Sequence, residues 1–117
     1  MENIFQLVHV GINQSSEEEA KKTAGLLAAA FNLNVRAGNK SVFAGEYFEC
    51  MRAPYLGTNG HIAMGTPDLE AAMAELKEKG FAFREDTAQY DEEGKLKNIY
   101  LDGEFGGFAI HILRHGS

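Results

Sequence analysis

Three histidines lie in short segments whose residues alternate between bulky and small side chains. The segments are FQLVHVGI with His9, GHIAMG with His61 and GGFAIHIL with His111. Because successive residues of a β-strand point to opposite faces, the bulky aliphatic groups fall on one face of each strand. The histidine then lies on the other face, among small neighbours that leave room around the imidazole. Neutral imidazoles in that setting are candidate metal ligands.

One acidic residue has a similar setting. Glu49 lies in the apolar segment EYFECMR, with Tyr47 and Met51 on its own face and Phe48 and Cys50 on the opposite face. A carboxylate that is buried there without a partner costs several kcal/mol. Glu49 therefore needs a cation or hydrogen-bond donors.

The elements that must position these side chains follow the order strand-helix-strand-strand-strand, and this order occurs twice. Strands are expected near 5–12, 34–37, 41–44, 46–51, 60–65, 81–84, 97–102 and 108–113. The polar and acidic run EDTAQYDEEGKL (85–96) is interpreted as a solvated loop.

Two helices are expected, one in each copy of the pattern. Ser16 caps the first, with Glu19 completing a capping box, and Asn32 ends it. Its apolar stripe is predicted to be Ala20, Ala24, Leu27 and Phe31. The second is expected to have Thr66 as its cap, Pro67 in its first position, Asp68 in its first turn and Gly80 past its end. Its apolar stripe is predicted to be Leu69, Ala72, Met73 and Leu76.

The repeat predicts an α+β domain that spans 1–117. Module one covers 1–52, a linker covers 53–59 and module two covers 60–117. Each module is βαβββ, with its helix on one face of a mostly antiparallel sheet. The two half-sheets curl together, so that the faces without helices form a cup.

The repeat also relates the four candidate ligands in pairs. His9 and His61 lie in the first strand of each module, and Glu49 and His111 lie in the fourth. A pseudo-two-fold axis would bring all four to one point. Three imidazoles and a carboxylate suit a divalent ion such as Zn, Ni, Mn, Fe or Co. A single strand histidine is more often a hydrogen-bonded structural residue, so the prediction depends on the four residues together.

The alternation of side chains along each strand also selects residues for the rim and wall of the cup. Asn98 and Tyr100 face away from the core side of their strand, and Arg52 and Tyr55 lie at a strand exit. These four are candidate substrate-binding residues, although ordinary edge positions are an alternative for each. His115 follows the last strand and is expected to be solvated.

Composition excludes several classes of protein. The net charge of −6 argues against nucleic acid and anionic lipid surfaces as partners. No apolar run approaches the ~20 residues of a membrane span. Cys50 is the only cysteine, so neither an internal disulfide nor a thiolate zinc cluster can form. We expect a cytoplasmic protein with a small-molecule substrate.

At these residues the sequence resembles the vicinal oxygen chelate superfamily, which includes glyoxalases and bleomycin-resistance proteins. HVGIN is similar to the family's first metal-histidine segment, GHIAMGTPDLEAAMAELKEKGFAF to its mid-chain strand-helix-strand, and YFECM to the strand that offers Glu or Gln. GEFGGFAIHIL departs from the pattern, because His111 stands where a ligand Glu is common. A closer likeness is to the small glyoxalase-like domain attached to some 2-keto-3-deoxy-6-phosphogluconate aldolases.

The resemblance implies a metal-dependent lyase or isomerase whose ion chelates two neighbouring oxygens of a 2-keto acid, sugar acid or α-hydroxycarbonyl compound. Glu49 is then the one ligand carboxylate that can serve as a base, which makes a two-base epimerase less favoured. A non-catalytic module that binds small molecules in 2-keto sugar acid metabolism is the alternative. The fold commonly pairs its modules between chains, so a homodimer is expected.

Overall fold

The structure, a computed structural model, describes residues 2–116. Each half of the chain contributes a strand, a helix and three further strands. The elements of the first half are β1 (Gln6–Asn13), α1 (Glu17–Phe31), β2 (Val35–Ala37), β3 (Ser41–Ala44) and β4 (Phe48–Met51). Those of the second half are β5 (Gly60–Thr66), α2 (Leu69–Glu78), β6 (Phe83–Tyr90), β7 (Leu96–Phe105) and β8 (Phe108–Arg114).

All eight strands belong to one mixed sheet in the order β2-β3-β4-β1-β5-β8-β7-β6. β1 and β5 lie antiparallel at its centre and join the two halves. Each of them also has a parallel neighbour, β4 beside β1 and β8 beside β5, and the remaining pairs are antiparallel. The sheet stays open, with β2 and β6 at its edges. The predicted α+β class with two βαβββ modules is confirmed.

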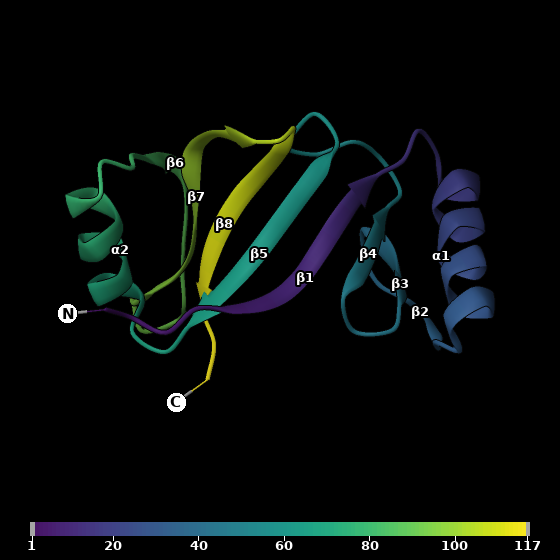
Figure 1. Cartoon of the computed structure of the whole chain (residues 1–117), viewed down its shortest axis with the longest axis horizontal. Coiled ribbons are helices and arrows are strands. Elements are labelled where there is room, and N and C mark those ends of the chain that lie inside the picture. The colour runs from purple at the N-terminus through teal and green to yellow at the C-terminus, as the bar shows by residue number, and fades with distance from the viewer. Residues whose placement is uncertain (1, 117) are drawn as a thin grey trace.

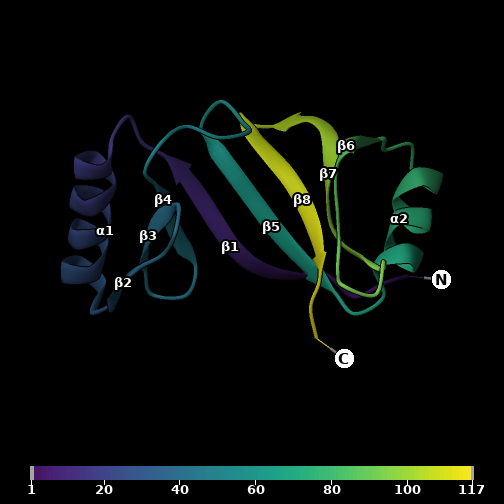
Figure 2. The same ribbon diagram turned by 180° about the vertical axis from the view of Figure 1, so that it is seen from behind.

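The helices lie at the two ends of the molecule, as both views show (Figure 1, Figure 2). α1 packs on β3 and β4, and α2 lies against β7 and β8. α1 begins as predicted, because the Ser16 hydroxyl accepts a hydrogen bond from the Glu19 backbone N–H. It ends as predicted at Asn32, whose backbone is left-handed. In the described part of the chain, no helix is long and apolar enough to cross a bilayer.

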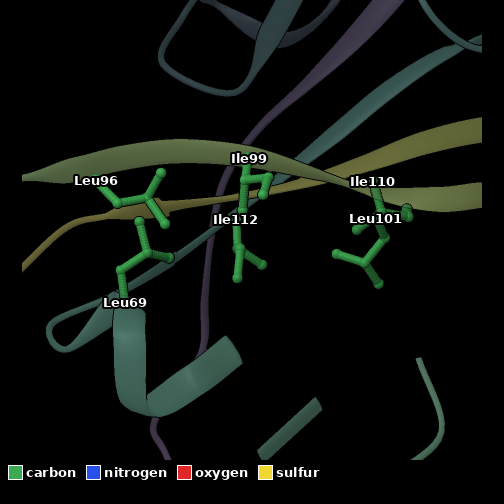
Figure 3. Packing of buried hydrophobic residues seen from close by; sticks show 6 residues of the cluster. All are labelled: Leu69, Leu96, Ile99, Leu101, Ile110 and Ile112. Carbon is green, nitrogen blue, oxygen red and sulfur yellow. The ribbon is translucent and has the colours of Figure 1, made fainter. Parts of the chain in front are cut away.

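Two apolar clusters fill the space between the sheet and the helices. The cluster at α1 is Ala20, Ala24, Val42, Ala44 and Cys50. The cluster at α2, drawn in Figure 3, is Leu69, Leu96, Ile99, Leu101, Ile110 and Ile112. Ile110 and Ile112 flank His111 on β8, so the core side chains leave the opposite face of that strand to the imidazole. Cys50 is fully buried on the helix side, as alternation predicts.

The structure corrects the expected start of the second helix. Asp68, not Thr66, is the cap, because the Asp68 carboxylate accepts a hydrogen bond from the Ala71 backbone N–H. Thr66 is the last residue of β5, so Pro67 lies outside the helix. The predicted stripe of α2 is correct: Leu69 and Ala72 are buried, and Met73 and Leu76 are packed against the cluster or partly buried.

Three further expectations were wrong. The segment 85–90 is part of β6, not a loop, and β7 continues to Phe105. β6 is an edge strand, and an edge strand can carry charged side chains without burying them. The predicted stripe of α1 is wrong at its last residue: Phe31 is 65% exposed, whereas Leu33, just after α1, packs against the apolar cluster at this helix.

Candidate metal centre

The four predicted ligands project from the four central strands of the sheet. β4 carries Glu49, β1 carries His9, β5 carries His61 and β8 carries His111. Gly11 of β1 lies opposite both Glu49 and His61, and Ala63 of β5 lies opposite both His9 and His111. This register places all four side chains on one face.

Three donor atoms form a small triangle. The Nε2 atoms of His9 and His61 lie 3.2 Å apart. Glu49 Oε1 lies 3.0 Å from Nε2 of His61 and 3.2 Å from Nε2 of His9. Donors about 2.1 Å from a common ion lie roughly 3.0 Å apart at octahedral angles and roughly 3.4 Å apart at tetrahedral angles. The triangle therefore has the edge lengths of a coordination polyhedron.

His111 presents a free nitrogen to the same place. Its Nδ1 donates to Oδ1 of Asn98, and its Nε2 is buried with no hydrogen-bond partner in the described residues. Because Nδ1 carries the proton, the neutral ring keeps its lone pair on Nε2. Nitrogen atoms of His9, His61 and His111 all lie within 4.8 Å of one another. A buried, unpartnered lone pair beside three other donors fits a divalent cation.

Two supporting side chains occupy corresponding positions in the two modules. The Ser41 hydroxyl donates to Oε2 of Glu49 at 2.8 Å, and Asn98 accepts from His111. Ser41 lies opposite Met51 on β4, and Asn98 lies opposite Leu113 on β8, each two residues beyond the ligand. Such contacts fix the orientation of a ligand. Sequence reasoning did not identify this role for either residue.

Gly11 makes room for one of the imidazoles. A Cβ atom placed on Gly11 would lie 2.0 Å from Cε1 of His61 and 2.3 Å from its Nδ1. The His61 ring therefore lies directly over the Gly11 backbone, and any side chain there would displace it.

Burial sets the protonation of the cluster. Burial, followed by the charges of His61 and His9, lowers the pKa of His111 to about 3. Burial also lowers the pKa of His9, against the raising effect of Glu49. Burial opposes ionisation of Glu49, but hydrogen bonds from His61 and Ser41 outweigh it, so its pKa lies below the usual value. At neutral pH, His9 and His111 are thus neutral beside an ionised Glu49, which is the state that binds a cation.

The cluster opens into a cavity of about 490 Å³. Of the predicted substrate-binding residues, Tyr55, Asn98 and Tyr100 line it. The Tyr100 ring stacks on His111 with centroids 4.6 Å apart, and its pKa is raised by burial. Asn98 bonds to His111, so its amide oxygen already has a partner.

Arg52, the fourth predicted substrate-binding residue, is not among the residues that line the cavity. Its guanidinium donates to the carbonyl oxygens of Gly38 and Asn39 and pairs with Glu17 at 3.2 Å. Three cationic residues that strand alternation did not select also line the cavity: Lys40, Lys97 and Arg114. His115 is exposed and lies outside this cavity, as predicted.

The chain matches no protein-family model, and no curated protein is significantly similar in sequence. Solved structures are similar along nearly the whole chain. A hypothetical protein from Bacillus halodurans has a TM-score of 0.65 at 18% identity, with 97% of this chain and 96% of its own covered. A selenomethionine methylmalonyl-CoA epimerase has a TM-score of 0.63 at 17% identity, with 100% of both chains covered.

A third structure is a Streptomyces coelicolor methylmalonyl-CoA epimerase in complex with 2-nitronate-propionyl-CoA. Its TM-score is 0.59 at 16% identity, with 96% of this chain and 98% of its own covered. The chain has the vicinal oxygen chelate fold. Module one supplies His9 and Glu49, and module two supplies His61 and His111, so neither half of the chain holds the whole cluster.

Proposed function

We propose that this protein is a divalent-metal-dependent isomerase or lyase that acts on a small compound with two neighbouring oxygens, such as a 2-keto acid, a sugar acid or an α-hydroxycarbonyl compound. The donor triangle of His9, His61 and Glu49, with edges of 3.0 to 3.2 Å, carries the proposal. The unpartnered Nε2 of His111 supports it.

In this proposal His9, Glu49, His61 and His111 hold a Zn, Ni, Mn, Fe or Co ion. The ion supplies Lewis acidity that stabilises negative charge on the substrate oxygens. Glu49 is the base that takes a proton from the carbon next to the carbonyl. Tyr55 and Tyr100 line the cavity that would hold the substrate. Tyr100 is protonated at neutral pH, and burial raises its pKa further above neutrality.

The cavity supports chemistry with one base. Glu49 is the only carboxylate among its described lining residues, and an imidazole, His111, occupies the corresponding position of the second module. An imidazole bound to a metal has little basicity left. A one-base isomerase or lyase therefore fits this donor set better than a two-base epimerase.

Proton exchange tests the proposed activity. Purified protein without a polyhistidine tag, reconstituted with each of the five ions, is incubated in deuterated buffer with 2-keto and 2-hydroxy acids. We expect metal-dependent loss of an α-proton signal by NMR, at a rate at least about 100-fold lower in Glu49→Gln. His115→Ala, which removes the exposed histidine, is the matched control and should exchange at the wild-type rate. Equal rates in Glu49→Gln and wild type would contradict the assignment of the base.

A non-catalytic binding module linked to 2-keto sugar acid metabolism is the second candidate. One observation favours it: both oxygens of Glu49 have partners, Oε2 with Ser41 and Oε1 with His9 and His61. A base with no free oxygen cannot take a proton without rearrangement. A keto sugar acid that raises the melting temperature but shows no proton exchange would favour this second function.

The proposal extends to assembly and location. Leu26, Phe31 and Val35 are 64%, 65% and 53% exposed near the outer end of module one, which supports a homodimer that covers them. The buried free thiol of Cys50 suits a cytoplasmic protein. Sedimentation of the wild type and of Phe31→Glu tests the dimer: the variant should sediment as a monomer, and a monomeric wild type would contradict this part.

A further inference from the structure

Two lysines occupy corresponding positions in the two modules. Lys40 precedes Ser41, and Lys97 precedes Asn98, the two residues that support Glu49 and His111. The match is set by register, because Ser41 pairs with Met51 as Asn98 pairs with Leu113. The repeat thus supplies one lysine beside each supporting residue, and both lysines line the cavity.

Neither lysine has an ion-pair partner among the described residues. The lysine ion pairs found there involve Lys21 and Lys79, so no carboxylate neutralises Lys40 or Lys97. The third lining cation differs, because Arg114 donates to Asp91 Oδ2 at 2.6 Å and to the Leu96 carbonyl at 3.0 Å. The free positive charge of the cavity therefore belongs to the two lysines.

This charge contrasts with the rest of the molecule. The chain carries a net charge of −6, yet Glu49 is the only carboxylate among the described residues of the cavity. A divalent ion would more than neutralise Glu49. A positive cavity in an acidic protein attracts small anions and repels cations.

The strand register places the two lysines toward opposite ends of the central strands. Lys40 lies at the end of the sheet where β1 and β4 finish, because Asn13 and Ser41 both pair with Met51. Lys97 lies near the end of β8, and β1 and β8 run in opposite directions across Figure 1. The proposed metal ligands lie between them on the central strands.

We propose that the ligand of this site is a small acid with a negatively charged group on each side of a central pair of neighbouring oxygens, and that Lys40 and Lys97 each bind one charged group. This inference rests on the proposed metal centre, which would take the central oxygens. The charged groups are carboxylates or phosphates, since an ammonium binds either as a point charge. Tyr55 lies beside Lys40, whose Nζ is 5.9 Å from the Tyr55 ring centroid, and both residues line the cavity.

Calorimetric titration of the nickel-loaded protein tests the inference with four probes. Threitol offers neighbouring oxygens without charge, glycerate adds one carboxylate, tartrate has two carboxylates, and 3-phosphoglycerate has a carboxylate and a phosphate. We expect tartrate or 3-phosphoglycerate to bind at least about tenfold more tightly than glycerate, and threitol to bind most weakly. The better of the two doubly charged probes identifies the kind of anionic group.

Substitution of the lysines makes the test specific. Lys40→Met and Lys97→Met should each weaken binding of the doubly charged probe by about three- to tenfold, and the double variant should bind it no better than glycerate. Lys95→Met, two residues from Lys97 but outside the lining, is the matched control and should bind as the wild type does.

Metal content, measured before and after each titration, separates this inference from the proposed function. Protein that holds no nickel contradicts the metal centre itself. Protein that holds nickel but binds glycerate as tightly as the doubly charged acids overturns the inference alone. The inference is also overturned if the Lys40 and Lys97 variants bind the doubly charged probe as tightly as Lys95→Met does, or if neither doubly charged acid binds.

Discussion

Glu49 and His111 each depend on one neutral side chain from the neighbouring strand. The Ser41 hydroxyl donates a hydrogen bond to Oε2 of Glu49, and Asn98 Oδ1 accepts a hydrogen bond from Nδ1–H of His111. The first contact leaves Oε1 facing the imidazoles, and the second leaves Nε2 without a proton. Both atoms thereby keep a lone pair directed at the cluster.

Loss of either support should weaken metal binding. Ser41→Ala and Asn98→Ala are each expected to lower the affinity for nickel by about tenfold or more, measured by competition with a chelator. Ser16→Ala, which removes the cap of α1, is the control: it should reduce stability by about 1 kcal/mol and leave the affinity unchanged. Equal affinities in all three variants would contradict the supporting roles.

The histidines also predict how stability depends on pH. The folded pKa of His111 is about 3, whereas the unfolded value is about 6.5. Between these values the unfolded chain binds a proton that the folded chain does not, so stability falls as the pH decreases from about 6.5 toward 3. The lowered pKa values of His9 and Glu49 act in the same direction.

For metal-free protein, His111 alone should contribute a slope of up to about 1.4 kcal/mol per pH unit. Urea unfolding between pH 7 and pH 4 measures it, and His111→Gln should show a shallower dependence than the wild type. His115→Ala, at an exposed position, should keep the wild-type slope. A wild-type stability that is flat or rises on acidification would show that His111 is not buried and neutral.

Strand alternation and the repeat were sufficient to select the four candidate ligands. Each histidine lies on the face of its strand that does not carry most of the bulky apolar side chains, and the repeat relates Glu49 to His111. They could not assign Ser41 and Asn98, whose contacts depend on the register between strands. A local signal was available: Lys40-Ser41-Val42-Phe43 matches Lys97-Asn98-Ile99-Tyr100 residue by residue. The contacts of Arg52 with Gly38, Asn39 and Glu17 could not be predicted, because strand alternation does not say where a long side chain at a strand end finds its partners.

At the level of elements, close approach of β1 and β5 positions the histidines of both modules. Gly11 is paired with His61, and the ring of His61 covers the glycine. Strand pairing alone therefore does not place His61: the strand opposite must lack a side chain at that point. The need for glycine there was not visible in the sequence, because the pairing of β1 with β5 is a contact between residues about 50 positions apart.

Gly11→Ala should remove metal binding without unfolding the protein. The added Cβ would lie within 2.0 Å of the His61 ring, so the imidazole must rotate away from His9 and Glu49. Gly25→Ala in α1 is the matched control, since nothing lies within 4 Å of its new Cβ. It should stabilise the helix by up to about 1 kcal/mol and keep the metal. Circular dichroism and metal content measure both effects, and a Gly11→Ala variant that binds metal normally would contradict the placement of His61.

The edge strand β6 shows where element prediction failed. Its sequence, FREDTAQY, has no continuous apolar face, so period-two patterning gave no signal. The strand forms because β7 offers it a partner, and solvent accepts its charges. The central strands β1, β5 and β8 were easier to predict, since each alternates bulky apolar side chains on one face with mostly small or polar side chains on the other.

At the scale of the whole molecule, the proposed ion would join the two halves of the chain. His9 and Glu49 come from module one and His61 and His111 from module two. The modules also meet through the pairing of β1 with β5 and through the segment before β1, where Asn3 donates hydrogen bonds to Glu75 and Ala71. An ion that binds only this folded arrangement stabilises it by mass action.

Metal should therefore raise the melting temperature. At a free ion concentration 1,000 times the dissociation constant, the gain is about 4 kcal/mol, which corresponds to roughly 10 °C or more for a domain of this size. Differential scanning calorimetry with nickel and with a chelator measures it. The shift should disappear in His111→Gln and persist in His115→Ala; a shift of equal size in both would place the ion elsewhere.

The fold class and the position of the cup could be predicted from the sequence, because the repeated order of elements limits how two half-sheets can meet. The positive charge of the cup could not be predicted, because only the register between strands brings Lys40 and Lys97 to the same cavity. The positive cavity is thus a property of the assembled sheet.

The most direct test of the account is the metal content of protein purified without a polyhistidine tag and reconstituted with nickel or zinc, measured by mass spectrometry after gel filtration. We predict about one ion per chain in the wild type and in His115→Ala, and close to none in the His9→Ala, His61→Ala double variant. A double variant that retains as much metal as the wild type, or a wild type that retains none, would contradict the proposed centre.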